Sequence, residues 1–417
     1  MTWRISSNGR LERLVVFLGR EAVPVGELVF QGAGRKRTAL FRYARSWLED
    51  VERRRPLSLV GLPLVAKAKD GTPYEVPLPF YDAAPDGWGK SVLEAAYPMQ
   101  VFGMGEFLAA AGDERIGELR FGHDPSEGPE QWGPHAPSVV LPDGSESLED
   151  LVLAAEAVDA GQAKPRHLAM LLRDSADQGG ARPKARLRHQ GVDWIAKFKA
   201  WGDGFDNPRM EAVCLSLADA CGIVPPEHHI QHVAGRSVLL VRRFDRTATG
   251  ERVGYMSAAT LVKAEPGTYS TNWTYATLAS AARQSGIVPC EAELFRRMLF
   301  NCAVHNTDDH LRNHAFLRGD DGRWRLSPVF DVVPNASKTM VLRPSPDVEA
   351  TADIDVAFKA WPKFLLTQEQ ALEIRQQVED GMRRLPEMLD LHKVSAHDRE
   401  TLAPLLPTLG TQTTPRP

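Results

Sequence analysis

The sequence predicts an α+β fold of more than one domain, in which a small α/β module precedes a mixed region and a mainly helical C-terminal part. Three observations support this prediction. The chain has 417 residues, which is too long for one ordinary domain. Strand-like and helix-like patterns alternate up to about residue 255. From about Met256 onward, apolar residues recur mostly at helical spacing.

The composition is that of a globular protein, and it excludes several classes of function. Hydrophobic residues make up 43% and charged residues 25%, and no run of eighteen apolar residues predicts a membrane span. The N-terminus lacks the pattern of a signal peptide, so we expect a cytoplasmic protein without a membrane partner. A net charge of -4 gives no reason to expect direct binding to nucleic acid. The four cysteines form no close pairs, which predicts reduced core residues.

The first module is predicted from strands and one helix. LERLVVFLG and VGELVF have strand patterns, FRYARSWLEDVE is predicted as a helix, and PLSLVGLPLV is again strand-like. Between His123 and Pro142 the sequence contains five prolines and no helical period, which predicts an exposed connector. We therefore place a domain boundary in this segment.

The second part begins with a capping box, in which Ser147 is followed three residues later by Asp150. A Gly-rich turn, GGARPKA, precedes a predicted strand, VDWIAKF. The helix RMEAVCLSLADACG follows, with Gly222 at its end, and then the strand SVLLVRRFDR. We expect an N-terminal module (1–123), a connector (124–146) and a region with the Gly-rich loop (147–255). A helical region (256–408) and a flexible tail (409–417) follow.

The segment NTDDHLRN places polar residues directly after the apolar helix pattern ELFRRMLFNCAVH. Protein kinases use an aspartate as the base and an asparagine five positions later as a metal ligand. Asp308 and Asn313 have this spacing, whereas Asp309 lies only four positions before Asn313. The spacing therefore favours Asp308 as the catalytic base. His310 is predicted as an orienting group, and a purely structural alternative is that the two aspartates cap a helix.

A second acidic metal ligand is expected after a short hairpin. WRLSPVFDVVP provides Asp331, which we predict at the end of an apolar strand. Asp331 and Asn313 would hold Mg²⁺ against the phosphates of ATP, where the ion offsets the charge that repels the attacking oxygen.

The phosphate-binding elements of a kinase are expected upstream, on a strand, a helix and a glycine turn. Lys197 lies on the predicted strand and Glu211 on the following helix, where it would hold that lysine. The turn Gly179–Gly180, followed by Ala181, would let backbone N–H groups approach phosphate. Arg182 and Lys184 add positive charge. Each feature is common by itself, and a solvated lysine or a surface glutamate is the structural alternative. The four features in this order are much less common together, and they match the plan of a protein kinase.

These motifs together resemble the HipA-type toxin kinases of bacterial toxin–antitoxin systems. The resemblance is based on GGARPKA, WIAKF, NTDDHLRN and LSPVFDVVP, and it extends to near residue 390. It implies a HipA-like bilobal fold, serine/threonine kinase activity with ATP and Mg²⁺, and a protein substrate such as an aminoacyl-tRNA synthetase. It also implies a small HipB-like DNA-binding antitoxin, through which any DNA contact would be indirect. By the same resemblance, Asp308 matches the base, Asn313 and Asp331 the metal ligands, and Lys197 the nucleotide-binding lysine. Phe244 falls in the segment that borders the adenine.

One position departs from the family pattern. Many members have a serine three residues before the second glycine of the turn, and its autophosphorylation switches the kinase off. Asp177 stands there in this chain, and Ser175 is a nearby alternative site. The aspartate could mimic the phosphate, end the regulation, or be a solvated turn residue.

Two other functions share some of these features. A small-molecule phosphotransferase has the same spacing of aspartate and asparagine, but the N-terminal module and GGARPKA argue against it. A catalytically silent protein that only binds the antitoxin is the other alternative. The presence of Lys197, Asp308, Asn313 and Asp331 argues against a silent protein.

Overall fold

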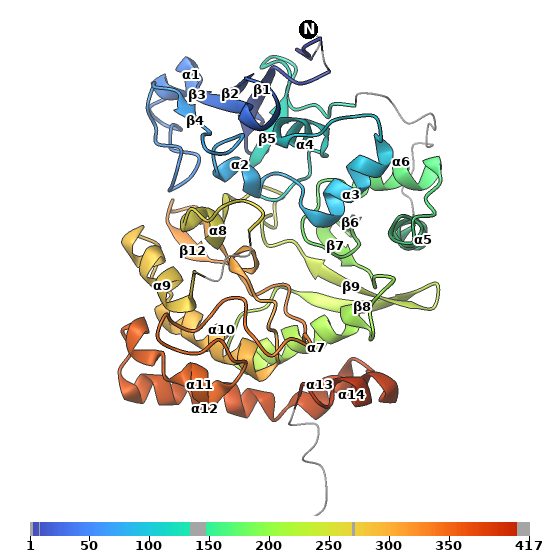
Figure 1. The fold of residues 1–417 in the computed structure, drawn as a ribbon, viewed down its shortest axis with the longest axis vertical. Coiled ribbons are helices and arrows are strands. Elements are labelled where there is room, and N and C mark those ends of the chain that lie inside the picture. The colour runs from blue at the N-terminus through green and yellow to red at the C-terminus, as the bar shows by residue number, and fades with distance from the viewer. Residues whose placement is uncertain (1–2, 8, 134–146, 269–271, 407–417) are drawn as a thin grey trace, which may run out of the picture. The chain divides into compact units, whose positions relative to one another are not determined.

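The structure is a computed structural model that describes residues 3–7, 9–133, 147–268 and 272–406. The chain forms two compact units. Unit 1 comprises Met1–Trp201 and Asp245–Met256, and unit 2 comprises Gly202–Phe244 and Ser257–Pro417. Both contain helices and strands, as Figure 1 shows, so the predicted α+β class is confirmed. Among the described residues, no helix is both long enough and apolar enough to cross a membrane. Part of the predicted connector and the predicted tail lie outside these residues.

An antiparallel sheet with the order β4-β3-β2-β1-β5 forms the N-terminal part of unit 1. Both expected strands at its centre are present, and all residues of β1 after Arg13 are buried. The strands are β1 (Arg13–Leu18), β2 (Val23–Gln31), β3 (Thr38–Tyr43), β4 (Lys69–Asp70) and β5 (Leu119–Gly122). Short helices connect and cover them: η1 (Gly34–Lys36), α1 (Arg45–Glu49), α2 (Pro79–Asp82), α3 (Gly87–Ala96) and α4 (Met104–Ala110).

Two local predictions in this module are wrong. FRYARSWLEDVE is divided between the end of β3 and the short helix α1, because Ala39, Phe41 and Tyr43 are buried at alternate positions and β3 pairs with β2. PLSLVGLPLV forms no strand. Its prolines cannot donate to a ladder, and the Tyr43 hydroxyl binds it instead, accepting from Leu57 N at 3.0 Å and donating to Leu62 O at 2.9 Å.

Glu106 lies at the centre of a buried ionic cluster in unit 1. Its side chain is 0% exposed, and it accepts hydrogen bonds from the backbone N–H groups of Leu11 and Gly103, both at 2.9 Å. The guanidinium of Arg10 donates to both carboxylate oxygens, at 3.0 and 3.1 Å, and Arg37 Nη1 donates at 2.8 Å. One carboxylate therefore joins α4 to the chain segments that precede β1 and β3.

The rest of unit 1 contains a helix pair and a hairpin. Helix α5 (Leu148–Asp159) begins with the predicted capping box, in which Ser147 Oγ accepts from Asp150 N at 3.1 Å. It packs against α6 (Pro165–Asp174). After the Gly-rich turn, β6 (Lys184–His189) and β7 (Val192–Lys197) form an antiparallel hairpin, which confirms the strand predicted in VDWIAKF.

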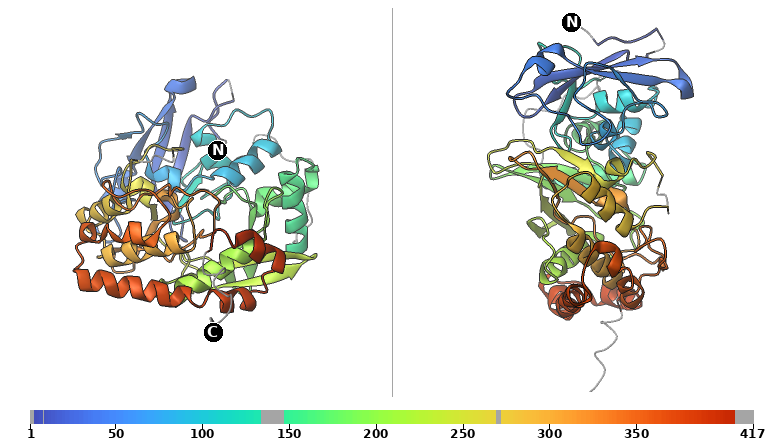
Figure 2. Two further views of the ribbon diagram at one scale, coloured as in Figure 1. Left: turned by 60° about the horizontal axis from the view of Figure 1, so that its bottom comes forward. Right: turned by 90° about the vertical axis from the view of Figure 1, so that its left-hand side faces the viewer.

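Unit 2 is mainly helical, as predicted from its spacing of apolar residues. Helix α7 (Asn207–Ala220) is followed by Gly222 at φ 76° and then by the hairpin of β8 (His228–Val233) and β9 (Arg236–Arg242). The long helices α10 (Glu291–Ala303) and α12 (Gln368–Met382) pack side by side (Figure 2). The remaining elements are α8 (Ala258–Leu261), α9 (Tyr275–Gln284), η2 (Leu311–Asn313), β11 (Ala315–Arg318), β12 (Trp324–Leu326), α11 (Ile354–Phe358), η3 (Trp361–Phe364), α13 (Leu385–Leu391) and α14 (Ala396–Leu402). A short strand, β10 (Tyr255–Ser257), lies at the boundary of the units.

All four cysteines are buried as free thiols, in agreement with the prediction of core residues. Burial raises the pKa of Cys221, Cys290 and Cys302 to about 12 in each case. These thiols therefore stay protonated at neutral pH, and they are poor nucleophiles and metal ligands.

The lowered pKa of His392, which lies at the end of α13, predicts that the protein loses stability in acid. Burial, together with the nearby charges of His228 and Arg209, lowers the pKa of His392 to about 4 from a usual 6.5. Its Nε2 lies 2.8 Å from Ser216 Oγ, which also contacts His228 Nε2 at 3.1 Å. Between these two pKa values the unfolded chain binds more protons at this residue than the folded chain does. The contribution of His392 to stability therefore falls as the pH drops from about 6.5 to about 4.

We expect His392→Gln to make the free energy of unfolding less dependent on pH in this window. Urea unfolding at several pH values, with the exposed His189→Gln as the control, measures the effect. An unchanged pH dependence in His392→Gln would contradict the prediction.

Candidate active site

The turn after α10 places two neighbouring aspartates in different surroundings. Helix α10 ends at Ala303, and residues 307 and 308 form a turn before η2. Asp308 is exposed, whereas Asp309 is only 2% exposed. An exposed carboxylate can meet a substrate hydroxyl, and a buried one cannot do so without a rearrangement.

The carboxylate of Asp309 belongs to a buried hydrogen-bond network. The Tyr275 hydroxyl donates to Asp309 Oδ2, and His314 Nε2 lies 2.9 Å from the same oxygen. Asn301 Nδ2 donates to the Tyr275 hydroxyl at 2.8 Å, and Asn306 Nδ2 donates to Asn301 Oδ1 at 3.0 Å. Burial, followed by the charge of Asp309, raises the pKa of Tyr275 well above its usual range, so the tyrosine remains a donor.

Backbone hydrogen bonds hold both sides of Asp308. The carbonyl of Thr307 accepts from Val341 N at 2.9 Å, and that of Asp309 accepts from Leu342 N at 3.0 Å. Further back, His305 O accepts from Asn335 N at 2.9 Å. The backbone of the turn is therefore fixed while the side chain of Asp308 faces solvent.

His310 directly precedes the short helix η2, and Asn313 is its last residue. The backbone carbonyl of His310 accepts from Asn313 N at 2.8 Å, and Asn313 is 8% exposed. The fold around η2 thus keeps Asp308 and Asn313 within one tight segment, five positions apart.

Asp331 lies in an irregular segment rather than at the end of a strand, because β12 already ends at Leu326. Its φ is 60°, a left-handed conformation that aspartate tolerates better than most residues do. Its N–H donates to Glu211 Oε1 at 3.2 Å, so α7 holds the backbone of this residue. Glu211 is 4% exposed, and the predicted pairing of Glu211 with Lys197 stays a prediction. Next to Asp331, the ring of Phe330 lies 5.4 Å from that of Phe244.

The Gly-rich turn in unit 1 is held by Trp88 of α3. Trp88 N donates to Gly180 O at 2.8 Å, and Trp88 Nε1 donates to Ser175 Oγ at 2.6 Å and to Lys184 O at 3.0 Å. Gly180 has φ 81°, and a Cβ atom there would collide with the ammonium of Lys184. Gly179, Ala181 and Arg182 are exposed. The turn therefore combines exposed backbone with a left-handed residue that favours glycine.

Lys184 and Lys197 are direct partners across the β6–β7 hairpin. Paired residues in an antiparallel ladder place their side chains on the same face, so two positive charges lie side by side next to the Gly-rich turn. Lys184 is 8% exposed and Lys197 is half-buried. A role of these residues in binding phosphate stays a prediction.

The two candidate regulatory residues of the turn are both buried. Asp177 is 5% exposed and accepts from Gln178 Nε2 at 2.6 Å, so its interpretation as a solvated turn residue is wrong. Ser175 is 0% exposed, and its hydroxyl donates to Lys184 O. Phosphorylation of Ser175 would therefore require this segment to move.

Several residues of this site were absent from the sequence-based prediction. Trp88 lies about ninety positions before the turn that it supports, and Tyr275 lies 34 positions before Asp309. No local pattern connects residues so far apart. His314, directly after Asn313, could have been considered, because a histidine beside a polar loop is a common partner for a carboxylate.

Comparisons with known proteins identify the family. Residues 14–122 match the HipA N-terminal domain, and residues 176–385, about half of the chain, match the HipA-like C-terminal domain. The chain belongs to the HipA family. The predicted resemblance is confirmed, and the protein is a HipA-like serine/threonine kinase of a family that uses ATP.

One solved structure supports the HipA fold. The HipA toxin of Shewanella oneidensis MR-1, solved in a complex with HipB and operator DNA, matches with a TM-score of 0.66 and 17% identity over 95% of both chains. The Helicobacter pylori proinflammatory kinase CtkA matches with a TM-score of 0.43 and 15% identity, over 56% of this chain and 90% of that one. A comparison with curated protein sequences gave no match.

Proposed function

We propose that this HipA-family chain transfers the γ-phosphoryl group of ATP to a serine or threonine of a protein that acts in translation, such as an aminoacyl-tRNA synthetase. The observation that carries this proposal is the contrast between two neighbouring aspartates. Asp308 is exposed on a fixed turn at the kinase spacing from Asn313, while Asp309 is buried in a network that supports the turn.

Asp308 would act as the base of the reaction. Its carboxylate accepts the proton of the substrate hydroxyl as that oxygen attacks phosphorus. The backbone hydrogen bonds of Thr307 and Asp309 reduce the freedom of the turn, so little ordering remains to be done when the substrate binds. His310 would orient the turn through its backbone carbonyl, which holds Asn313 N.

The residues present suit Mg²⁺ and ATP. Asn313 and Asp331 offer amide and carboxylate oxygens, the donor types that Mg²⁺ prefers. When bound, the ion would neutralise charge on the phosphates. Gly179, Gly180, Ala181 and Arg182 would contact phosphate oxygens from the turn, and Lys184 and Lys197 would supply positive charge. Glu211 would keep Asp331 in place, because its carboxylate accepts the backbone N–H of Asp331. Phe244 would border the adenine.

The proposed partner is a small HipB-like DNA-binding antitoxin. The Shewanella protein was solved with HipB and operator DNA, which makes this kind of partner the natural candidate for a related chain. The net charge of -4 does not favour a direct contact with DNA, so the antitoxin would make it. A toxin that acts on translation would work in the cytoplasm.

Incubation of the purified protein with labelled ATP, Mg²⁺ and a cell lysate tests the proposal. We expect label on a protein band, with phosphoserine or phosphothreonine in a translation protein identified by mass spectrometry. Lys197→Ala should lose the labelling because the phosphates are no longer held. Label on small molecules alone, or none at all, would contradict a protein kinase.

A further inference from the structure

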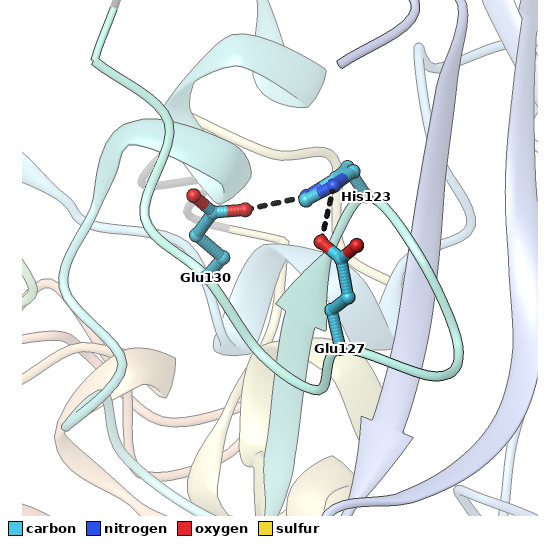
Figure 3. Close-up of side chains that lie close together, drawn as sticks. All are labelled: His123, Glu127 and Glu130. Carbon is cyan, nitrogen blue, oxygen red and sulfur yellow. Dashed lines mark ion pairs between the residues drawn. The ribbon is translucent and has the colours of Figure 1, made fainter. Parts of the chain in front are cut away.

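A cluster of one histidine and two glutamates lies at the end of the edge strand β5 in unit 1 (Figure 3). His123 follows directly after β5, and its side chain is 6% exposed. Glu127 Oε2 lies 3.0 Å from His123 Nε2, and Glu130 Oε2 lies 2.5 Å from His123 Nδ1. Both glutamate side chains are about half exposed. The imidazole is therefore held in the protein while the carboxylates reach solvent.

The ring nitrogens of His123 are close to the carboxylates but are not properly hydrogen-bonded to them. Both nitrogens are buried, and neither has a hydrogen-bond partner among the described residues. At these short separations the direction of the N–H bond, rather than the distance, is unsuitable. Buried polar atoms in folded proteins are normally satisfied by protein, water or an ion. The two ring nitrogens form ion pairs with Glu127 and Glu130, and both nitrogens can still bind a further ligand.

The loop that carries the glutamates is fixed by its own hydrogen bonds. Asp124 Oδ1 accepts from Ser126 N at 2.9 Å and from Ser126 Oγ at 2.5 Å. Glu130 N donates to Phe121 O at 3.0 Å, which ties the end of the loop to β5. A Cβ atom at Gly122 would collide with Gly128 O, so the loop can fold this tightly over the strand only with glycine at that position. The cluster is therefore preorganised by the backbone.

We propose that His123, Glu127 and Glu130 form a binding site for a divalent transition-metal ion of the Zn²⁺ type. Their candidate ligand atoms all lie within 4.8 Å of one another. Imidazole nitrogen and carboxylate oxygen both bind Zn²⁺ at roughly 2.0–2.2 Å, and a separation of 3.0 Å between Nε2 and Glu127 Oε2 suits two ligands of one ion. Two carboxylates beside one imidazole also give the cluster a negative charge that attracts a dication.

Glu130 has a different role from Glu127. The 2.5 Å distance between Glu130 Oε2 and Nδ1 is too short for two ligands of the same ion, but a small rotation of the ring on binding the ion would let this carboxylate accept the remaining ring N–H. Such an acceptor fixes the tautomer and the orientation of a metal-bound histidine. Water would complete the coordination shell on the exposed side. The bound ion would tie the loop to the end of β5, and it shares no residue with the proposed kinase site.

Titration of the full chain with Zn²⁺ by calorimetry, without nucleotide and with excess Mg²⁺ to fill the oxygen-rich sites, tests this inference. We expect saturable binding of Zn²⁺ that Glu127→Gln weakens at least tenfold, since a direct ligand is lost. Glu130→Gln should weaken it by about 10-fold to 100-fold, the usual effect of removing an orienting partner. His189→Ala, which removes an exposed histidine of β6, serves as the matched control and should bind like the parent.

Thermal unfolding provides a second measurement. Zn²⁺ should raise the Tm of the parent and of His189→Ala more than that of Glu127→Gln, because a ligand that binds only the folded state stabilises it. Glu127 is exposed, so its replacement by glutamine should not prevent folding. The proposal is wrong if the parent binds no Zn²⁺ under these conditions, or if Glu127→Gln binds as tightly as the parent. The cluster would then be only a histidine between two carboxylates.

Discussion

Asp308→Asn is expected to lower the rate of phosphotransfer by about a hundredfold to ten-thousandfold, the usual effect of losing a positioned base. The amide cannot accept the proton of the attacking hydroxyl. Affinity for ATP should remain, because Asp308 acts on the substrate hydroxyl and not on the nucleotide. Single-turnover assays with labelled ATP measure the rate, and calorimetric titration with ATP measures the affinity. Full activity in this variant would show that Asp308 is not the base.

Asp309→Asn is the matched control, because it makes the same chemical change one position away. Asp309 is buried and accepts from Tyr275 and His314, so its replacement weakens charge-assisted hydrogen bonds. We expect a loss of about 1.5–3 kcal/mol in the free energy of unfolding and a much smaller loss of rate than in Asp308→Asn. The exposed Asp308→Asn should change stability by less than about 0.5 kcal/mol. If both variants lost rate and stability to the same degree, the separate roles of the two aspartates would be refuted.

Elements whose pattern is local could be predicted from the sequence. The apolar faces of α7 and α10, the strand β7 and the capping box of α5 all depend on residues within a few positions of one another. At β3, hydrogen bonding to the neighbouring strand β2 decides the structure, although the local pattern predicts a helix. Phe41 and Tyr43 fit a helix as well as a strand, but pairing with β2 gives them a place in the core of the sheet.

The candidate site could be predicted only in part, for a related reason. Sequence spacing distinguishes Asp308 from Asp309, and the structure then gives the two residues different surroundings. The role of Asp309 could not be predicted, because it depends on Tyr275 and Asn301, which reach it only through the packing of α9 and α10. The backbone N–H of Asp331, a residue in the left-handed conformation, likewise donates to Glu211, which lies 120 positions earlier. The cluster at His123 lies in a segment that its prolines marked only as a connector.

Glu106→Ala is expected to lower the free energy of unfolding by about 3–5 kcal/mol, the usual cost of removing one partner from a buried ion pair. Burial raises the pKa of Glu106, but hydrogen bonds and charge from Arg10 and Arg37 more than offset this effect, and the pKa lies below its usual 4.5. The carboxylate is therefore charged at neutral pH. Its loss would leave the guanidinium of Arg37, which is 5% exposed, without this partner.

The lowered pKa of Glu106 also predicts how the loss of stability in Glu106→Ala depends on pH. Because the folded chain holds the pKa of Glu106 below its value in the unfolded chain, its stabilising contribution is complete above the unfolded pKa and is lost as the pH falls through the folded pKa. Glu106→Ala should thus differ most from the parent near neutral pH and less in acid. Guanidinium unfolding at neutral and acidic pH measures both effects, with Glu94→Ala on the exposed face of α3 as the control. Of these two glutamates, Glu106 is the one that accepts hydrogen bonds from Leu11, Gly103 and two arginines. Equal stability of the two variants at neutral pH would therefore mean that the buried cluster does not hold unit 1 together.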